Sequence, residues 1–136
     1  KGLVYFNDIL AVLPFGNTIV EVAMSVKNIK DMIEQGLSEI ETSNSRLLQI
    51  SGGSYVYDRK KPAGDRLVEL SFKYQPIDPQ RHYTVAIPDY LLSGGDDFDI
   101  QIKNRYKEKQ TDVKILEHYL KTRRKIPINA ERINVN

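Results

Sequence analysis

Two short segments carry the side chains whose types and spacing fit the binding of a small ligand. Residues 13–17 (LPFGN) place an aromatic ring between a proline and a glycine, next to the amide of Asn17. Residues 87–98 (IPDYLLSGGDDF) place Tyr90 after a proline and follow it with two glycines and Asp96. A double glycine allows backbone conformations that other residues avoid. Both segments are expected to be loops, and a large apolar ring in a loop is either buried or used for binding.

Two loop aromatics, an amide and a carboxylate together suit a nucleoside. The rings of Phe15 and Tyr90 can stack on the two faces of a base, with about 1–3 kcal/mol from each ring. The amide of Asn17 can pair with a base edge, and the carboxylate of Asp96 can accept hydrogen bonds from ribose hydroxyls. The alternative is that both rings cap the core and that Asp96 and Asp97 form a solvated acidic turn.

Other kinds of chemistry find no support in the sequence. There is no cysteine, which excludes disulfides, thiolate metal sites and a cysteine nucleophile. His82 and His118 have no partner at metal-ligand spacing, and the GxSxG, phosphate-loop and GxGxxG motifs do not occur. Adjacent carboxylates on an extended chain point to opposite sides, so Asp96 and Asp97 are a poor acid–base pair. We therefore expect neither a catalytic residue nor a metal ligand in this chain.

The composition is that of a soluble domain with a real core. The chain has 136 residues, of which 40% are hydrophobic, and its 20 Lys and Arg against 18 Asp and Glu leave a formal charge of +2. This near balance argues against nucleic acid as a partner. No apolar run approaches the ~20 residues of a transmembrane helix. The basic run at residues 121–125 is either a phosphate-binding patch or a set of cations at a helix C-terminus.

Periodicity predicts the elements that must position these loops. Asn7, Asn28 and Thr111 are the expected N-caps of three helices, the first of which stops at Pro14. Alternation of apolar residues predicts half-buried strands. The expected strands span residues 20–26, 47–50, 55–58, 68–74, 83–87 and 98–102. The fold class that follows is α+β, with a mixed or antiparallel sheet and flanking helices in a single domain over residues 1–136, of which 126–136 form an extended tail.

Four segments in the same order resemble one known family. They are DILAVLPFGNTIVEV (8–22), LLQISGGSYVYD (47–58), KPAGDRLVEL (61–70) and YTVAIPDYLLSGGDDF (83–98). These segments resemble the C-terminal domain of the 5′-nucleotidases, a family of metallophosphoesterases that hydrolyse nucleotides and UDP-sugars. The resemblance covers about residues 6–98, and the PFGN and GGD segments are its most specific parts.

The resemblance implies that this domain binds the nucleoside of the substrate. By motif, Phe15 corresponds to one stacking ring and Tyr90 to the second, which is usually a phenylalanine in the family. Asn17 corresponds to the amide near the base, and Asp96 to the carboxylate that takes the ribose hydroxyls. Asp97 stands where glycine is common. The implied substrate-binding residues are Phe15, Gly16, Asn17, Tyr90, Gly94, Gly95 and Asp96.

The resemblance also implies a longer parent protein. A separate N-terminal metallophosphoesterase domain is expected to hold two divalent metal ions, and we interpret the chain, which begins at Lys1, as a fragment without that domain. The fragment alone is then expected to be inactive, and its partners are the nucleotide and the N-terminal domain. Family resemblance implies a periplasmic, secreted or cell-surface parent. Nucleoside monophosphates, cyclic nucleotides and UDP-sugars all stay open as substrates, and a non-catalytic binding or scaffold module is the alternative.

Overall fold

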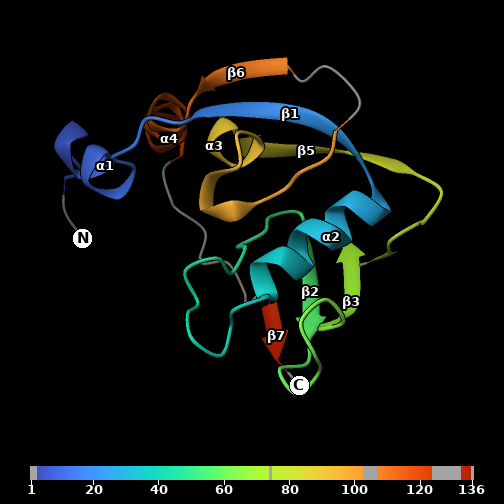
Figure 1. The fold of residues 1–136 in the computed structure, drawn as a ribbon. Helices are drawn as coiled ribbons and strands as arrows, with labels where there is room; N and C mark the ends of the chain where they lie inside the picture. Colours follow the sequence, from blue (N-terminus) through green and yellow to red (C-terminus); the bar gives the residue numbers. More distant parts are fainter. Residues whose placement is uncertain (1–2, 74, 103–106, 124–132, 136) are drawn as a thin grey trace.

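The computed structural model describes residues 3–73, 75–102, 107–123 and 133–135. One sheet lies above the other in Figure 1, with a helix between them and further helices at one end of the upper sheet. The helical elements are α1 (Phe6–Val12), α2 (Val26–Leu37), α3 (Asp89–Leu92), the turn η1 (Gly95–Asp97) and α4 (Asp112–Thr122). The strands are β1 (Thr18–Ser25), β2 (Gly53–Tyr57), β3 (Leu67–Phe72), β4 (Gln75–Pro76), β5 (His82–Pro88), β6 (Lys107–Thr111) and β7 (Ile133–Val135).

The first sheet has the strand order β5-β1-β6, and both pairings are antiparallel. Its central strand alternates as the sequence predicts, because side chains along a strand point to opposite faces. Val20, Val22 and Met24 are buried in the core, whereas Ala23 between them is exposed. This sheet is the part of the fold that positions the candidate site, since the loops at residues 13–17 and 89–97 flank β1 and β5.

Helix α2 fills the space between the two sheets (Figure 1). Its apolar residues recur every three or four positions, so they lie on one face of the helix, and that face is buried. The buried residues are Val26, Ile29, Met32, Ile33, Gly36 and Leu37. Ser25 is the N-cap, and its side chain accepts a hydrogen bond from the backbone N–H of Asn28. The β1 strand thus passes directly into α2 without a loop.

The second sheet has the order β4-β3-β2-β7 and is mixed, because β2 pairs antiparallel with β3 and parallel with β7. Tyr55, Tyr57 and Leu70 point into the core between the sheets. The hydroxyl of Tyr55 donates a hydrogen bond to the carbonyl of Leu48 at 2.8 Å. An α+β fold with flanking helices is therefore confirmed.

Several predicted boundaries are wrong in a physically informative way. The N-cap of α1 is Tyr5 rather than Asn7, and the N-cap of α2 is Ser25 rather than Asn28. The side chain of Asn28 instead donates to the carbonyl of Gln101 at 2.7 Å. Thr111 caps α4 as predicted, since its hydroxyl accepts from the N–H of Lys114. Several nearby polar residues can cap the first-turn N–H groups of a helix. Contacts with distant parts of the chain decide which of them does so.

Two predicted strands do not form. Residues 47–50 pass close to α2, where a Cβ on Gly36 would lie 3.3 Å from the Leu48 side chain, and no strand of the described ranges pairs with them. Residues 98–102 are held by side chains of α2 instead of by a neighbouring strand. Strand β6 was not predicted. Of the predicted tail, residues 126–132 and 136 lie outside the described residues, while 133–135 form β7.

Candidate functional site

Strand pairing brings the two candidate loops to one end of the first sheet. In the β1–β5 register Ile19 pairs with Pro88, so the segment before β1 and the segment after β5 leave the sheet side by side. The backbone carbonyl of Asn17 accepts a hydrogen bond from the N–H of Asp112 at 2.9 Å, which adds the start of α4 to the same end. In Figure 1 the helices α1, α3 and α4 gather at this end, on the left.

Asp89 ties the two loops together. Its Oδ1 atom accepts a hydrogen bond from the N–H of Thr18 at 3.0 Å and another from the N–H of Tyr90 at 2.9 Å. One carboxylate oxygen thus joins the first residue of β1 to the first turn of α3. Sequence reasoning did not assign this role to Asp89, although its position directly after Pro88 and before the aromatic residue places it at a helix start, where a carboxylate is favoured.

The ring of Tyr90 lies directly over Gly95. A Cβ on Gly95 would come 2.5 Å from the Cδ1 atom of that ring, so only glycine fits beneath it without a shift. The Tyr90 hydroxyl donates to Oδ1 of Asp96 at 3.1 Å and accepts from the backbone N–H of Asp96 at 3.2 Å. Tyr90 as a whole residue stays 46% exposed. The second candidate loop is therefore a closed turn with an aromatic ring along one side.

The turn itself runs through the left-handed region of backbone conformation. Gly94 has φ 85°, Asp96 has φ 50° and Asp97 has φ 57°. Glycine adopts such angles freely, whereas side chains with a Cβ do so at a cost that is smallest for Asn and Asp. The two aspartates are therefore among the residues best able to replace glycine here. Asp97 thus adopts a backbone conformation that glycine would also adopt readily.

The first candidate loop presents its ring to solvent. Phe15 is 85% exposed, and Gly16 after it has φ 63°. Phe15 therefore does not pack on the core, whereas Phe98, at the end of the second candidate segment, does so at 3% exposure. The side chain of Asn17 is half-buried and makes no hydrogen bond to the residues that the structure describes.

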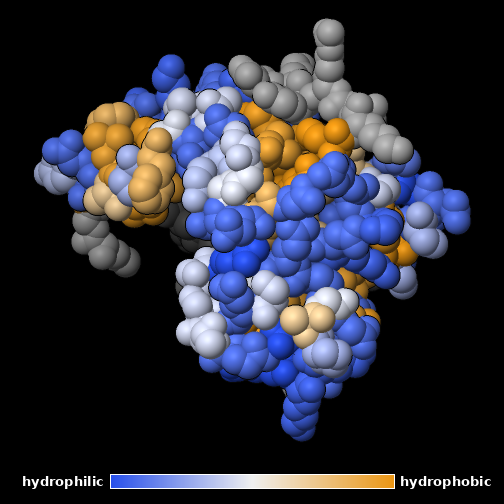
Figure 2. All heavy atoms as spheres, viewed as in Figure 1, coloured by the Kyte–Doolittle hydropathy of each residue, from blue (hydrophilic) through white to orange (hydrophobic). Residues whose placement is uncertain are grey.

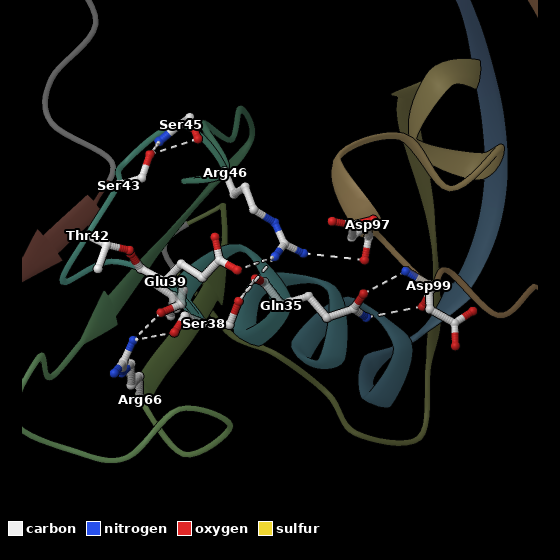
Figure 3. A network of polar contacts seen from close by, with 11 residues as sticks. Gln35, Ser38, Glu39, Thr42, Ser43, Ser45, Arg46, Arg66, Asp97 and Asp99 are labelled. Carbon is white, nitrogen blue, oxygen red and sulfur yellow. Dashed lines mark hydrogen bonds and ion pairs between the residues drawn. The ribbon is translucent and has the colours of Figure 1, made fainter.

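Side chains from α2 and from the loop after it hold the far end of the Tyr90 loop (Figure 3). The Gln35 side chain accepts from the N–H of Asp99 at 2.7 Å and donates to the carbonyl of Asp99 at 3.1 Å. The Arg46 guanidinium donates to the carbonyl of Asp97 at 3.4 Å and lies 5.1 Å from the centre of the Phe98 ring. Sequence reasoning missed both residues, because nothing in the local sequence identifies partners that lie 64 residues away for Gln35 and 51 residues away for Arg46.

The remaining candidate groups do not assemble into a reactive centre. Among the described residues no group of three or more His, Asp or Glu side chains could hold a metal ion. His82 and His118 are both exposed. Lys121 pairs with Glu117 at 2.7 Å within α4, and the basic residues 124 and 125 lie outside the described residues. The two divalent metals that the resemblance implies therefore have no site in the described part of this chain.

A cavity of about 820 Å³ borders the candidate segments at residues 13–17 and 89–97 only at Leu91. It is lined by α2, by residues 48–52 and by the facing strands β3 and β5, and its walls are mainly apolar. Among the residues that line this cavity, Pro88 and Leu91 stand next to the candidate site in the sequence. None of the seven predicted ligand-binding residues lines the cavity. Within the described ranges no helix is long and apolar enough to cross a membrane. The candidate site is an open surface feature rather than an enclosed cavity.

Comparison with known proteins gives consistent matches. A family model described as "5′-nucleotidase, C-terminal domain" matches residues 1–102. An apyrase of Tabanus yao is 28% identical over 144 residues, which cover 96% of this chain and 26% of the apyrase. The 5′-nucleotidase of Rattus norvegicus is 28% identical over 131 residues, covering 88% of this chain and 23% of that protein.

A solved structure agrees in fold over nearly the whole chain. The crystal structure of the 5′-nucleotidase precursor from Thermus thermophilus has a TM-score of 0.89 and 32% identity, and the match covers 99% of this chain and 28% of that one. The chain thus spans about a quarter of the length of these relatives. Both the sequence match over residues 1–102 and the shared fold lead to one assignment: this chain belongs to the 5′-nucleotidase family, in which it corresponds to the C-terminal domain.

Proposed function

We propose that this chain is the nucleoside-binding domain of a 5′-nucleotidase-like phosphohydrolase. The observation that carries the proposal is the meeting of the two loops at one end of the β1–β5 pair, with two exposed rings and a carboxylate on them. Relatives named apyrase and 5′-nucleotidase support nucleotides as the substrate class. Whether the substrate is a nucleoside monophosphate, another nucleotide or a UDP-sugar does not alter the part proposed for this domain.

Each residue has a physical role in this proposal. Phe15 and Tyr90 stack on the base, because an exposed ring gains contact area and loses water when a flat ligand covers it. The amide of Asn17 pairs with the base edge, and Asp96 accepts hydrogen bonds from the ribose hydroxyls. Gly16, Gly94 and Gly95 shape the two loops. None of these residues takes part in bond cleavage, so their contribution is to substrate affinity.

The hydrolytic step belongs to another part of the parent protein in this proposal. Two divalent metals there would polarise the phosphate and activate water. The exposed apolar side chains of α1 and the residues before it fit a contact with that part, and Figure 2 shows them gathered on the left of the molecule. They are Leu3, Val4, Tyr5, Phe6, Leu10 and Val12. This chain alone is then inactive, and the parent is periplasmic, secreted or on the cell surface, as one relative, a snake venom 5′-nucleotidase, suggests.

The test measures steady-state kinetics of the full-length parent with two substrates. AMP carries both base and ribose, whereas ribose 5-phosphate lacks the base. For Phe15→Ala we expect KM for AMP to rise roughly 5- to 150-fold, from a stacking loss of about 1–3 kcal/mol. KM for ribose 5-phosphate and kcat for AMP should stay near their original values, because the lost contact is equal in ground and transition states.

Val68→Ala is the matched control. Val68 is 50% exposed and lies on β3 in the second sheet, away from the candidate loops. It should leave both KM values unchanged. If Phe15→Ala and the original protein have the same KM for AMP, the support for base stacking is removed. If KM rises equally for AMP and for ribose 5-phosphate, the substitution has caused a structural defect instead.

A further inference from the structure

One hydroxyl closes the loop that carries the candidate ribose-binding carboxylate. The Tyr90 hydroxyl donates to Oδ1 of Asp96 and also accepts the hydrogen bond of the Asp96 backbone N–H. It therefore holds both the side chain and the backbone of the same residue. The contact spans six positions of the chain and lies at an exposed end of the molecule.

Asp96 needs such a support for two reasons. Its backbone lies at φ 50°, in the left-handed region that an aspartate adopts less readily than glycine. Its side chain is exposed, so without a partner it would sample several rotamers. Ordering an exposed side chain costs entropy on ligand binding, and a group that is already ordered avoids that cost. A phenylalanine at position 90 would keep the ring but supply neither hydrogen bond.

The other carboxylate oxygen stays available. Among the described residues nothing donates a hydrogen bond to Oδ2 of Asp96, and an oxygen that accepts from one donor keeps a second lone pair. The Tyr90 hydroxyl thus orients the carboxylate without using up its capacity. A carboxylate in this state is suited to a vicinal diol, whose two hydroxyls can donate to the two oxygens.

We propose that the Tyr90 hydroxyl is a positioning group that makes the site selective for ligands with an intact ribose 2′,3′-diol. The inference rests on the proposed function, because it assigns a specificity to the same site. Tyr90 then has two separable parts. Its ring contacts the base, and its hydroxyl acts on the sugar through Asp96.

The variant Tyr90→Phe separates these parts, because it removes the hydroxyl and keeps the ring over Gly95. In the full-length parent we expect KM for AMP to rise about 3- to 10-fold, the range for loss of the one hydrogen bond that orients the Asp96 carboxylate, worth about 0.6–1.4 kcal/mol. KM for 2′,3′-dideoxy-AMP should change by less than about 2-fold, because that ligand has no diol to receive. In an Asp96→Ala background, Tyr90→Phe should have no further effect on AMP.

Tyr119→Phe is the matched control, since this tyrosine lies on α4 and its hydroxyl makes no hydrogen bond to the described residues. A second readout is independent of any ligand. Amide hydrogen exchange at Asp96 in the parent should become several-fold faster in Tyr90→Phe, because the N–H loses its acceptor. Both variants should unfold at the same temperature as the original protein.

Three results would overturn the inference. The first is an equal change of KM for AMP and its dideoxy analogue, and the second is tighter binding of AMP by Tyr90→Phe, which would show that the hydroxyl competes with ribose. The third is unchanged exchange of the Asp96 amide, which would show that the contact does not exist. A different variant tests the proposed function. If that proposal is wrong, Phe15→Ala will have the same kinetics with AMP as the original protein.

Discussion

Gly95→Ala is a steric test of the site that leaves every proposed binding side chain in place. A Cβ at this position would lie within 2.5 Å of three atoms of the Tyr90 ring, whereas ordinary contact begins near 3.4 Å. The ring must therefore retreat by about 1 Å or swing away. The backbone of Gly95 lies outside the left-handed region, so alanine brings no strain of its own there.

The expected cost falls on binding rather than on stability. Tyr90 is 46% exposed and its ring can move into solvent, so the free energy of unfolding should change by less than about 1 kcal/mol. Alanine also lowers the conformational entropy of the unfolded chain, and this stabilisation can offset a loss of that size. A displaced ring loses part or all of its stacking, which is worth about 1–3 kcal/mol. KM for AMP should rise by up to roughly 150-fold, and the effect of Tyr90→Ala sets the upper limit.

The assay compares Gly95→Ala, Tyr90→Ala and the double variant in the full-length parent. Because the alanine acts only through the ring, the double variant should match Tyr90→Ala alone. Thermal unfolding of the same samples checks the fold. The reasoning fails if folded Gly95→Ala binds AMP as well as the original protein, or if its effect adds in full to that of Tyr90→Ala.

Two further predictions concern the scaffold. Arg66→Ala should lower the free energy of unfolding by about 2–4 kcal/mol in urea denaturation, because the buried guanidinium donates to the carbonyls of Leu37 and Ser38 at the end of α2 and pairs with Glu41. Arg66→Lys should not restore this stability, since an ammonium lacks the planar array of N–H donors of a guanidinium. A loss below about 0.5 kcal/mol in Arg66→Ala would contradict this role. Burial, and then the nearby Tyr57, raises the pKa of Tyr55 above its ordinary value of 10.0. The unfolded chain therefore loses this proton first, and stability should fall as the pH rises above about 10. Tyr55→Phe should flatten that alkaline decline, and an equally steep decline in this variant would refute the assignment.

The elements that sequence predicted well are those whose burial pattern is local. Strand β1 alternates buried and exposed residues along its own length, and α2 repeats its apolar positions every three or four residues. Such patterns follow from the geometry of one element. The segments at residues 13–17 and 89–97 could also be located, because proline, glycine and aromatic residues in those combinations have few other uses. The second is not the continuous loop that the sequence predicted, since α3 and the turn η1 form within it.

The failures have a common physical cause, which is partnership with distant residues. Residues 98–102 alternate like a strand, but Gln35 and Asn28 of α2 bind their backbone groups. Strand β6 has a polar sequence, and only its pairing with β1 makes it a strand. The link from Tyr90 to Asp96 belongs to the same class, since the sequence places both in one loop without showing that the hydroxyl reaches the carboxylate.

A structure of the full-length parent with a bound nucleotide tests the central claim most directly. We expect the base to lie between the rings of Phe15 and Tyr90 and the ribose hydroxyls to donate to Asp96, with the Tyr90 hydroxyl still hydrogen-bonded to that carboxylate. A nucleotide whose base contacts neither ring, or whose ribose lies away from Asp96, would contradict it.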